Sequence, residues 1–238
     1  MESTAETQLS DWFEGPLGAR VLREEAALAM QALDNVFGFE LLQVGAWGPK
    51  RHLLDGARTQ HTTLLAPELT AGVTLCAPLD TLPFRSDSID AIFLPHTLEL
   101  VEDPYAVLRE AERVLTGEGC LLICGFNPFS GWGARRLSGR YFGRRAFPPG
   151  TQRMLSERRL RDWVALLGFD VDSVYGYLGF LPLNGGAADA RPRRALTAGG
   201  YLLKARKRIS TLTLVRPRRR VRQRVLVGAA EPTHKVRP

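Results

Sequence analysis

The sequence lacks a long hydrophobic run. None of its 238 residues falls in an uncharged apolar stretch of about 18, the length that a membrane-spanning helix needs. The N-terminus, MESTAETQLSDWFEG, is acidic and polar, unlike a secretory signal peptide. We therefore expect no transmembrane segment and a cytoplasmic location.

Cysteine is scarce too. Cys76, Cys120 and Cys124 are the only three, they form no CxxC pair, and all lie in apolar runs. We expect buried, reduced thiols. Three of the four histidines have no cysteine or carboxylate at metal-ligand spacing, so no metal site is expected. The chain also has no GxSxG, P-loop or HExxH motif.

Negative charge is nearly absent from the C-terminal end. Residues 1–131 hold 8 Lys/Arg and 19 Asp/Glu, whereas residues 191–238 hold 15 and 1. A basic end on an acidic body suggests contact with nucleic acid, an anionic membrane surface or an acidic partner. A solvated, disordered terminus explains the same charges, and both interpretations stay open.

Short apolar runs alternate with helical patterns along the chain. Seven runs predict strands, at residues 41–44, 61–65, 73–76, 89–94, 120–124, 170–174 and 201–205. Nearly continuous apolar strands that alternate with helices predict an α/β fold with a parallel sheet covered on both faces.

Three segments predict helices. In residues 18–36 apolar residues recur at spacings of three and four, with Glu24 and Glu25 on the other side. A second helix starts at Asp103, an N-cap followed by proline at the first helical position. A third starts at the N-cap Ser156 and ends at Gly168.

One continuous segment carries a family resemblance. Residues 82–128, LPFRSDSIDAIFLPHTLELVEDPYAVLREAERVLTGEGCLLICGFNP, contain LPF, SID, HTLE, DP, LREAERVL and a glycine turn in order. They resemble the class I S-adenosylmethionine-dependent methyltransferases of the type 11-like group. GFNPFSGWGARR, residues 125–136, is similar to a proteobacterial branch of that family.

The resemblance implies a fold and a cofactor. The fold is Rossmann-like and doubly wound, a mostly parallel seven-stranded sheet with helices on both faces. S-adenosylmethionine then lies across the carboxyl ends of strands one to four, beside the point where the strand order reverses. Its expected contacts are Gln43, Gly45, Gly48, Asp80, Leu82 and Pro95.

The first loop, in LLQVGAWGPK, departs from the family pattern. Trp47 and Pro49 replace glycines, and Gln43 replaces the acid that helps to hold the cofactor ammonium group. Pro67 and Pro78 stand where acids normally bind the ribose and the adenine. The sequence thus leaves open whether this turn still admits the methionine end of the cofactor.

The resemblance also assigns the catalytic side of the site. His96 follows the fourth strand, where the family places a residue that faces the transferred methyl group. Its imidazole can act as a general base. Alternatively, His96 only lines the site, because holding the methyl donor and the acceptor close together is enough for methyl transfer. Phe126 and Asn127, after the fifth strand, are expected to contact the substrate; the alternative is a hydrophobic clamp for the adjoining loop.

We expect three regions: a helical lid at 1–39, a methyltransferase-like α/β domain at 40–215 and a basic, disordered tail at 216–238. The expected function is S-adenosylmethionine-dependent methylation of a small-molecule or nucleotide-bearing acceptor. The missing acids keep a second hypothesis open, a non-catalytic methyltransferase-like binding or regulatory protein whose basic tail contacts nucleic acid.

Overall fold

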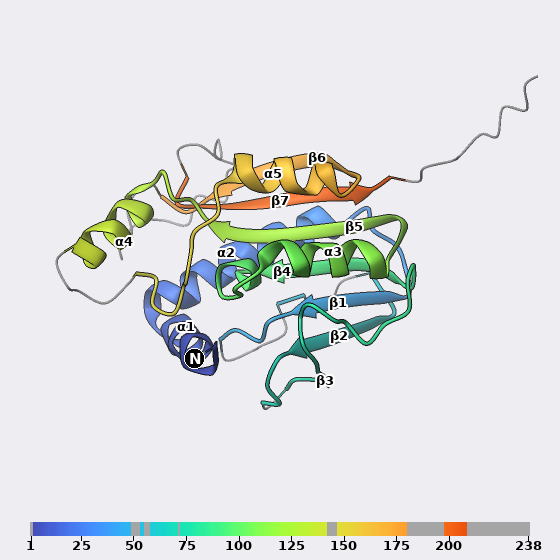
Figure 1. Ribbon diagram of the computed structural model, residues 1–238, viewed down its shortest axis with the longest axis horizontal. Helices are drawn as coiled ribbons and strands as arrows, with labels where there is room; N and C mark the ends of the chain where they lie inside the picture. The colour runs from blue at the N-terminus through green and yellow to red at the C-terminus, as the bar shows by residue number, and fades with distance from the viewer. Residues whose placement is uncertain are drawn as a thin grey trace, which may run out of the picture.

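A seven-stranded sheet forms the middle layer of the computed structural model, which describes residues 2–48, 53–54, 58–70, 72–141, 147–179 and 198–208 (Figure 1). The strands are β1 (Glu40–Val44), β2 (His61–Ala66), β3 (Leu75–Cys76), β4 (Ile89–Pro95), β5 (Leu115–Phe126), β6 (Phe169–Tyr177) and β7 (Gly200–Lys207). Their order is β3-β2-β1-β4-β5-β7-β6. β7 is antiparallel to both of its neighbours and the other pairs are parallel, which confirms the predicted mostly parallel sheet.

Helices cover both faces of the sheet, as predicted. They are α1 (Glu2–Glu14), α2 (Pro16–Leu33), the short 3-10 helix η1 (Thr97–Glu99), α3 (Pro104–Val114), α4 (Gly131–Tyr141) and α5 (Glu157–Leu166). In Figure 1, α3 and α5 lie in front of the sheet and α2 lies behind it. α1 lies beside the carboxyl ends of the parallel strands, on the left.

The two faces bury separate hydrophobic cores, because successive side chains of a strand point to opposite sides. β4 sends Ile92 and Leu94 into the core under α3 and α5. It sends Ala91 and Phe93 into the core under α1 and α2. Such strands are apolar throughout, which is why the sequence showed continuous rather than alternating apolar runs.

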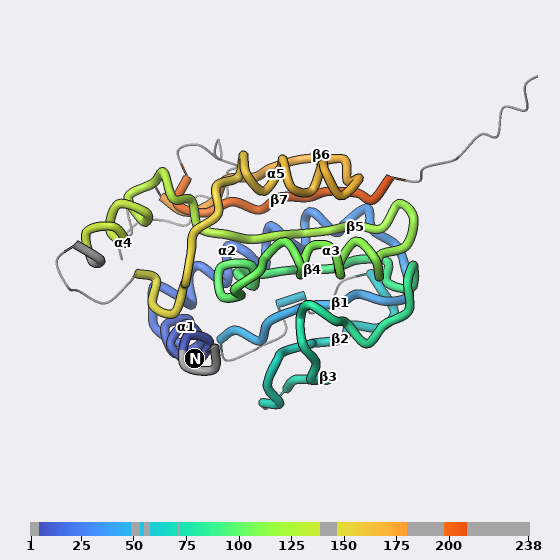
Figure 2. The backbone as a smooth tube through the Cα atoms, viewed as in Figure 1, coloured from blue at the N-terminus to red at the C-terminus, as the bar shows by residue number. Residues whose placement is uncertain are grey.

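The N-terminal helices pack closely on each other and on the sheet. Gly15 interrupts the helical pattern, and Pro16 starts α2 at its first position. A Cβ on Gly18 would collide with the Trp12 carbonyl, so glycine permits this close crossing of α1 and α2. Figure 2 shows the segment between α4 and α5 passing α1, where Gly150, at φ 79°, lies against the Ala5 carbonyl.

Several strands begin or end at other residues than the sequence predicts. β5 begins at Leu115 rather than at residue 120, since the backbone becomes extended directly after α3 and pairs with Ile89. β3 has only two residues and lies at the edge of the sheet. The described residues between β1 and β4 contain no helix, and α2 covers that face instead.

The prediction of three buried thiols is wrong for Cys76. Cys120 and Cys124 are buried, but Cys76 is exposed because it lies on the edge strand β3. All three are free thiols. In the described part of the chain no helix is long and apolar enough to cross a membrane. The predicted tail at 216–238 lies outside the described residues.

Ser156 caps α5 as predicted, since its hydroxyl accepts a hydrogen bond from the Arg159 amide at 3.3 Å. Replacing Ser156 by alanine should lower the free energy of unfolding by about 1 kcal/mol, because an amide of the first helical turn loses its acceptor. Urea denaturation measures this loss. Ser156→Asp should retain wild-type stability, since aspartate accepts the same bond and favours a helix N-terminus; an equal loss in both variants would contradict the capping role.

Candidate functional site

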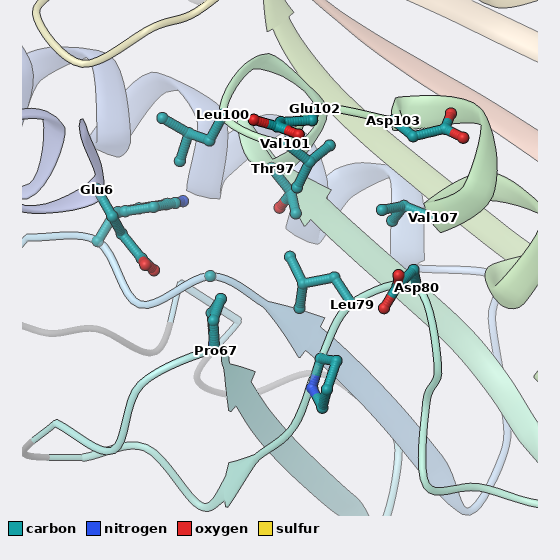
Figure 3. A pocket seen from close by; sticks show the side chains of 13 residues that line it. Glu6, Pro67, Leu79, Asp80, Thr97, Leu100, Val101, Glu102, Asp103 and Val107 are labelled. Atoms are coloured by element: carbon teal, nitrogen blue, oxygen red, sulfur yellow. The ribbon is translucent and has the colours of Figure 1, made fainter. Parts of the chain in front are cut away.

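A pocket of about 330 Å³ lies at the carboxyl ends of the strands (Figure 3). It is bounded by the loop after β1, the segments after β2 and β3, the segment from η1 into α3, and α1. Its lining residues are Glu6, Gly45, Trp47, Pro67, Pro78, Leu79, Asp80, Thr97, Leu100, Val101, Glu102, Asp103 and Val107. The pocket therefore lies where open α/β sheets bind their ligands, outside the carboxyl ends near the reversal of strand order between β1 and β4.

One side of the pocket combines apolar walls with a carboxylate. Leu79, Val101 and Val107 supply apolar surface, and Asp80 lies across the pocket from Glu6 of α1 (Figure 3). Asp103 is engaged in capping α3, where its Oδ1 accepts from the amides of Tyr105 and Ala106. A few polar groups on a mostly apolar wall are typical of a small-molecule site.

The loop after β1 is filled by its own tryptophan. Trp47 is buried, and its Nε1 donates a hydrogen bond to the Pro95 carbonyl at 2.6 Å. A Cβ on Gly45 would lie 2.8 Å from that Nε1, so the indole lies directly on the Gly45 backbone. The ring thus spans the ends of β1 and β4.

The polar groups of this loop bond within the protein. The Gln43 amide donates to the Gly45 carbonyl at 2.9 Å, and its Oε1 accepts from the Leu53 amide at 2.9 Å. A Cβ on Gly48 would lie 2.5 Å from Leu22 Cδ1, so Gly48 makes room for α2.

The structure brings only part of the predicted cofactor set to the pocket. Gly45 and Asp80 line it, whereas Gln43, Gly48, Leu82 and Pro95 are not among its lining residues. Leu82 is buried in the core under α3, and its amide donates to Glu110. The binding roles of all six residues stay predictions.

His96 lies beneath the N-terminal helices and is fully buried. Its Nε2 lies 2.6 Å from Glu25 Oε1, and its Nδ1 lies 2.7 Å from Glu99 Oε2. Its ring stacks on Phe126 at 4.1 Å between centroids, and Phe13 of α1 lies 5.5 Å from it. Neither ring nitrogen is open to the pocket.

The two carboxylates set the charge of His96. Burial disfavours the charged imidazolium, but Glu25 and Glu99 outweigh that effect and raise the pKa of His96 to about 10. Burial raises the pKa of Glu99, against the opposing effect of His96. His96 therefore carries its proton at neutral pH, and its predicted catalytic role stays a prediction.

Glu25 extends this network to the sheet. Its Oε1 also accepts from the Tyr177 hydroxyl at 2.6 Å, while its buried Oε2 has no hydrogen-bond partner among the residues that the structure describes. The Glu99 Oε1 accepts from the Phe126 amide at 2.8 Å. We name Glu25, His96, Glu99 and Tyr177 the buried network. The prediction that Glu25 lies on the polar side of its helix is wrong, because its side chain is buried against His96.

Phe126 and Asn127 also face the interior. Phe126 stacks on Trp132 at 5.4 Å between centroids and is fully buried. The Asn127 side chain donates to the Ala198 carbonyl at 3.0 Å and accepts from the Phe129 amide at 3.0 Å. These contacts hold the loop after β5, and substrate contact by either residue stays a prediction.

Comparison with known proteins agrees with this geometry. A protein-family model described as "Methyltransferase domain" matches residues 51–123. A methyltransferase from Haloferax volcanii, solved in complex with the Trm112 methyltransferase activator, superposes with a TM-score of 0.60 and 15% identity, over 86% of this chain and 98% of that chain. A methyltransferase structure from Thermotoga maritima gives a TM-score of 0.56 and 17% identity, over 79% of this chain and 89% of that chain.

Residues 51–123 thus match a methyltransferase domain, and the chain has the fold of S-adenosylmethionine-dependent methyltransferases. Among curated sequences, the Escherichia coli protein YafS is 36% identical over 137 residues, 58% of this chain and 55% of that protein. The chain therefore spans about half the length of this relative. A malonyl-[acyl-carrier protein] O-methyltransferase from Halorhodospira halophila is 35% identical over 75 residues, 32% of this chain and 25% of that protein.

S-adenosylmethionine, the cofactor of methyltransferases with this fold, fits one end of the pocket and not the other. The apolar walls and Asp80 fit its adenosyl part. At the ends of β1 and β4, the space on Gly45 and the Pro95 carbonyl are both taken by Trp47. The methionine part of the cofactor therefore does not fit beside Trp47 in this arrangement.

The buried network predicts a pH effect on stability. The pKa of His96 in the folded protein is about 10, above its ordinary value of 6.5. Its contribution to stability is therefore complete below pH 6.5 and is lost as the pH rises toward 10. In an NMR titration we expect the His96 ring to remain protonated at pH 8; the signal is assigned by its absence in His96→Gln.

Glu24 and Glu25 provide a matched pair for this experiment. Glu25→Gln should lower the midpoint of the His96 titration, because it removes one carboxylate from the ring. Glu24→Gln should leave it unchanged, since Glu24 bonds Arg20 and the Leu178 amide instead. A neutral His96 ring at pH 8 in the wild type, or equal shifts in both variants, would refute this charge assignment.

Proposed function

We propose that the protein is an S-adenosylmethionine-dependent methyltransferase that acts on a small-molecule or nucleotide-bearing acceptor. The observation that carries this proposal is the pocket at the carboxyl ends of β1 to β3, beside the strand reversal, within a methyltransferase domain. When bound, the cofactor supplies an already activated methyl group, so the protein needs chiefly to position an acceptor and exclude water.

The pocket walls support recognition of the adenosyl part. Leu79, Leu100 and Val101 offer apolar surface to a purine ring. Asp80 offers a carboxylate that accepts hydrogen bonds from an amino or hydroxyl group. Glu6 of α1 lines the pocket, which supports a role of residues 1–39 as a lid.

A non-catalytic binding protein is the second candidate function. Two observations favour it: Trp47 occupies the end of the pocket where the methyl group would lie, and His96 is buried between carboxylates rather than open to an acceptor. In this case the domain retains a nucleoside-binding pocket, and the basic end of the chain contacts nucleic acid.

Cofactor binding tests both candidates at the pocket. Isothermal titration calorimetry with S-adenosylmethionine and S-adenosylhomocysteine should detect binding to the wild type. Asp80→Asn should weaken it roughly tenfold, because a charged acceptor at the pocket wall is lost. Asp162→Asn, an exposed position on α5 outside the pocket, should bind as the wild type does. No heat and no thermal shift at millimolar ligand would exclude the methyltransferase.

Methyl transfer then separates the two functions. The protein is incubated with methyl-labelled S-adenosylmethionine and the small-molecule fraction of a cell extract. Label transferred to an acceptor supports the enzyme, whereas cofactor binding without transfer supports the binding protein.

The basic end gives a separate prediction. Deleting residues 216–238 removes 8 Lys/Arg and 1 Glu. If this end binds nucleic acid, the deletion should lower the affinity for an oligonucleotide and flatten its dependence on salt, because fewer counterions are released on binding. Fluorescence anisotropy at several salt concentrations measures both. An unchanged affinity and salt slope would exclude the tail as a nucleic-acid contact.

A further inference from the structure

Trp47 occupies the strand reversal itself. Its indole lies on Gly45 at the end of β1, and its Nε1 donates to the carbonyl of Pro95 at the end of β4, at 2.6 Å. Phe13 of α1 packs against it at 6.0 Å between ring centroids. With only 2% of its surface exposed, Trp47 is an interior residue that also forms one wall of the pocket.

Three polar groups at this end, which could hold an amino-acid moiety, already bond within the protein. Pro95 accepts from Trp47, Gly45 accepts from Gln43, and the Gln43 oxygen accepts from the Leu53 amide. What remains open is the other part of the site, beside Leu79, Asp80 and Val101. Its volume of about 330 Å³ is at the low end for ligand sites, which span roughly 300–1,000 Å³.

We infer that Trp47 determines the ligand preference of this pocket. With the indole in place the pocket takes an adenosine-type nucleoside or nucleoside thioether without an amino-acid arm. S-adenosylmethionine and S-adenosylhomocysteine bind only after Trp47 has left Gly45 and Pro95. This inference rests on the proposed function, because it assumes that the pocket recognises the adenosyl part.

Displacing Trp47 costs free energy. A nucleoside does not bear this cost, because it binds with Trp47 in place. The buried indole loses its hydrogen bond and its apolar contacts, and the Pro95 carbonyl loses a donor. The state with Trp47 displaced is therefore a minor one. A ligand that binds only this state has its apparent affinity reduced by the fraction of protein in it.

Two ligands isolate this effect, since they differ only in the group on the sulfur atom. 5′-Methylthioadenosine carries a methyl group there, and S-adenosylhomocysteine carries the amino-acid arm. By calorimetry, the wild type should bind 5′-methylthioadenosine at least about tenfold more tightly than S-adenosylhomocysteine. Trp47→Ala should bind S-adenosylhomocysteine at least about tenfold more tightly than the wild type does, with 5′-methylthioadenosine changed much less.

Trp132 is the matched control. It is also a buried indole that donates to a backbone carbonyl, that of Gly179 at 3.1 Å, but it does not line the pocket. Trp132→Ala should keep the wild-type ratio of the two affinities. Equal affinities in the wild type, or a ratio that Trp47→Ala leaves unchanged, would overturn the inference.

The wild-type protein offers a second readout in case Trp47→Ala does not fold. With fluorotryptophan incorporated, the Trp47 resonance is assigned by comparison with Trp47→Phe. It should shift strongly with S-adenosylhomocysteine and little with 5′-methylthioadenosine; similar shifts with both ligands would contradict displacement of the indole. If neither ligand binds the wild type or Trp47→Ala at millimolar concentration, the proposed function itself fails. Tight binding of both ligands to the wild type refutes only the role of Trp47.

Discussion

The ion pairs of His96 with two buried carboxylates constrain the rest of the structure. A buried charge is tolerated only when it is paired and hydrogen-bonded, so each member of the buried network requires the others. Glu25 comes from α2, His96 and Glu99 from the end of β4 and from η1, and Tyr177 from the end of β6. Glu99 also accepts a hydrogen bond from the Phe126 amide on β5. The N-terminal helices are thereby tied to three strands at the end of the sheet that carries the pocket.

This arrangement explains why His96, the predicted catalytic residue, is closed off from the pocket. With Glu25 held on His96, α2 lies on the face of the sheet opposite α3 and α5. The preceding helix, α1, lies beside the carboxyl ends of the parallel strands (Figure 1). Phe13 then contacts both His96 and Trp47, which buries the two residues together. The pocket lies beside Trp47, between the segments after β2 and β3 and the segment from η1 into α3.

Much of the fold was predictable because its signals are local. The caps at Asp103 and Ser156 fix helix starts within a few residues, and seven apolar runs mark seven strands. The site was less predictable because its contacts are distant in sequence. Glu25 and His96 are separated by 71 residues, so nothing near Glu25 in the sequence distinguishes it from the partly exposed Glu24. The exposure of Cys76 depends on β3 being an edge strand, which is a property of the whole sheet.

The departures in LLQVGAWGPK form one connected change. Gly45 still has the positive φ, 105°, and the absent side chain that the family pattern requires, but the space beside it holds Trp47. An aspartate or glutamate in place of Gln43 would set a buried carboxylate against the Gly45 carbonyl, so that two hydrogen-bond acceptors would face each other. The amide of Gln43 instead donates to one backbone group and accepts from another, as no ionised carboxylate can. The Gln43 amide and the Trp47 indole therefore stabilise the same turn, each through its own hydrogen bonds to the backbone.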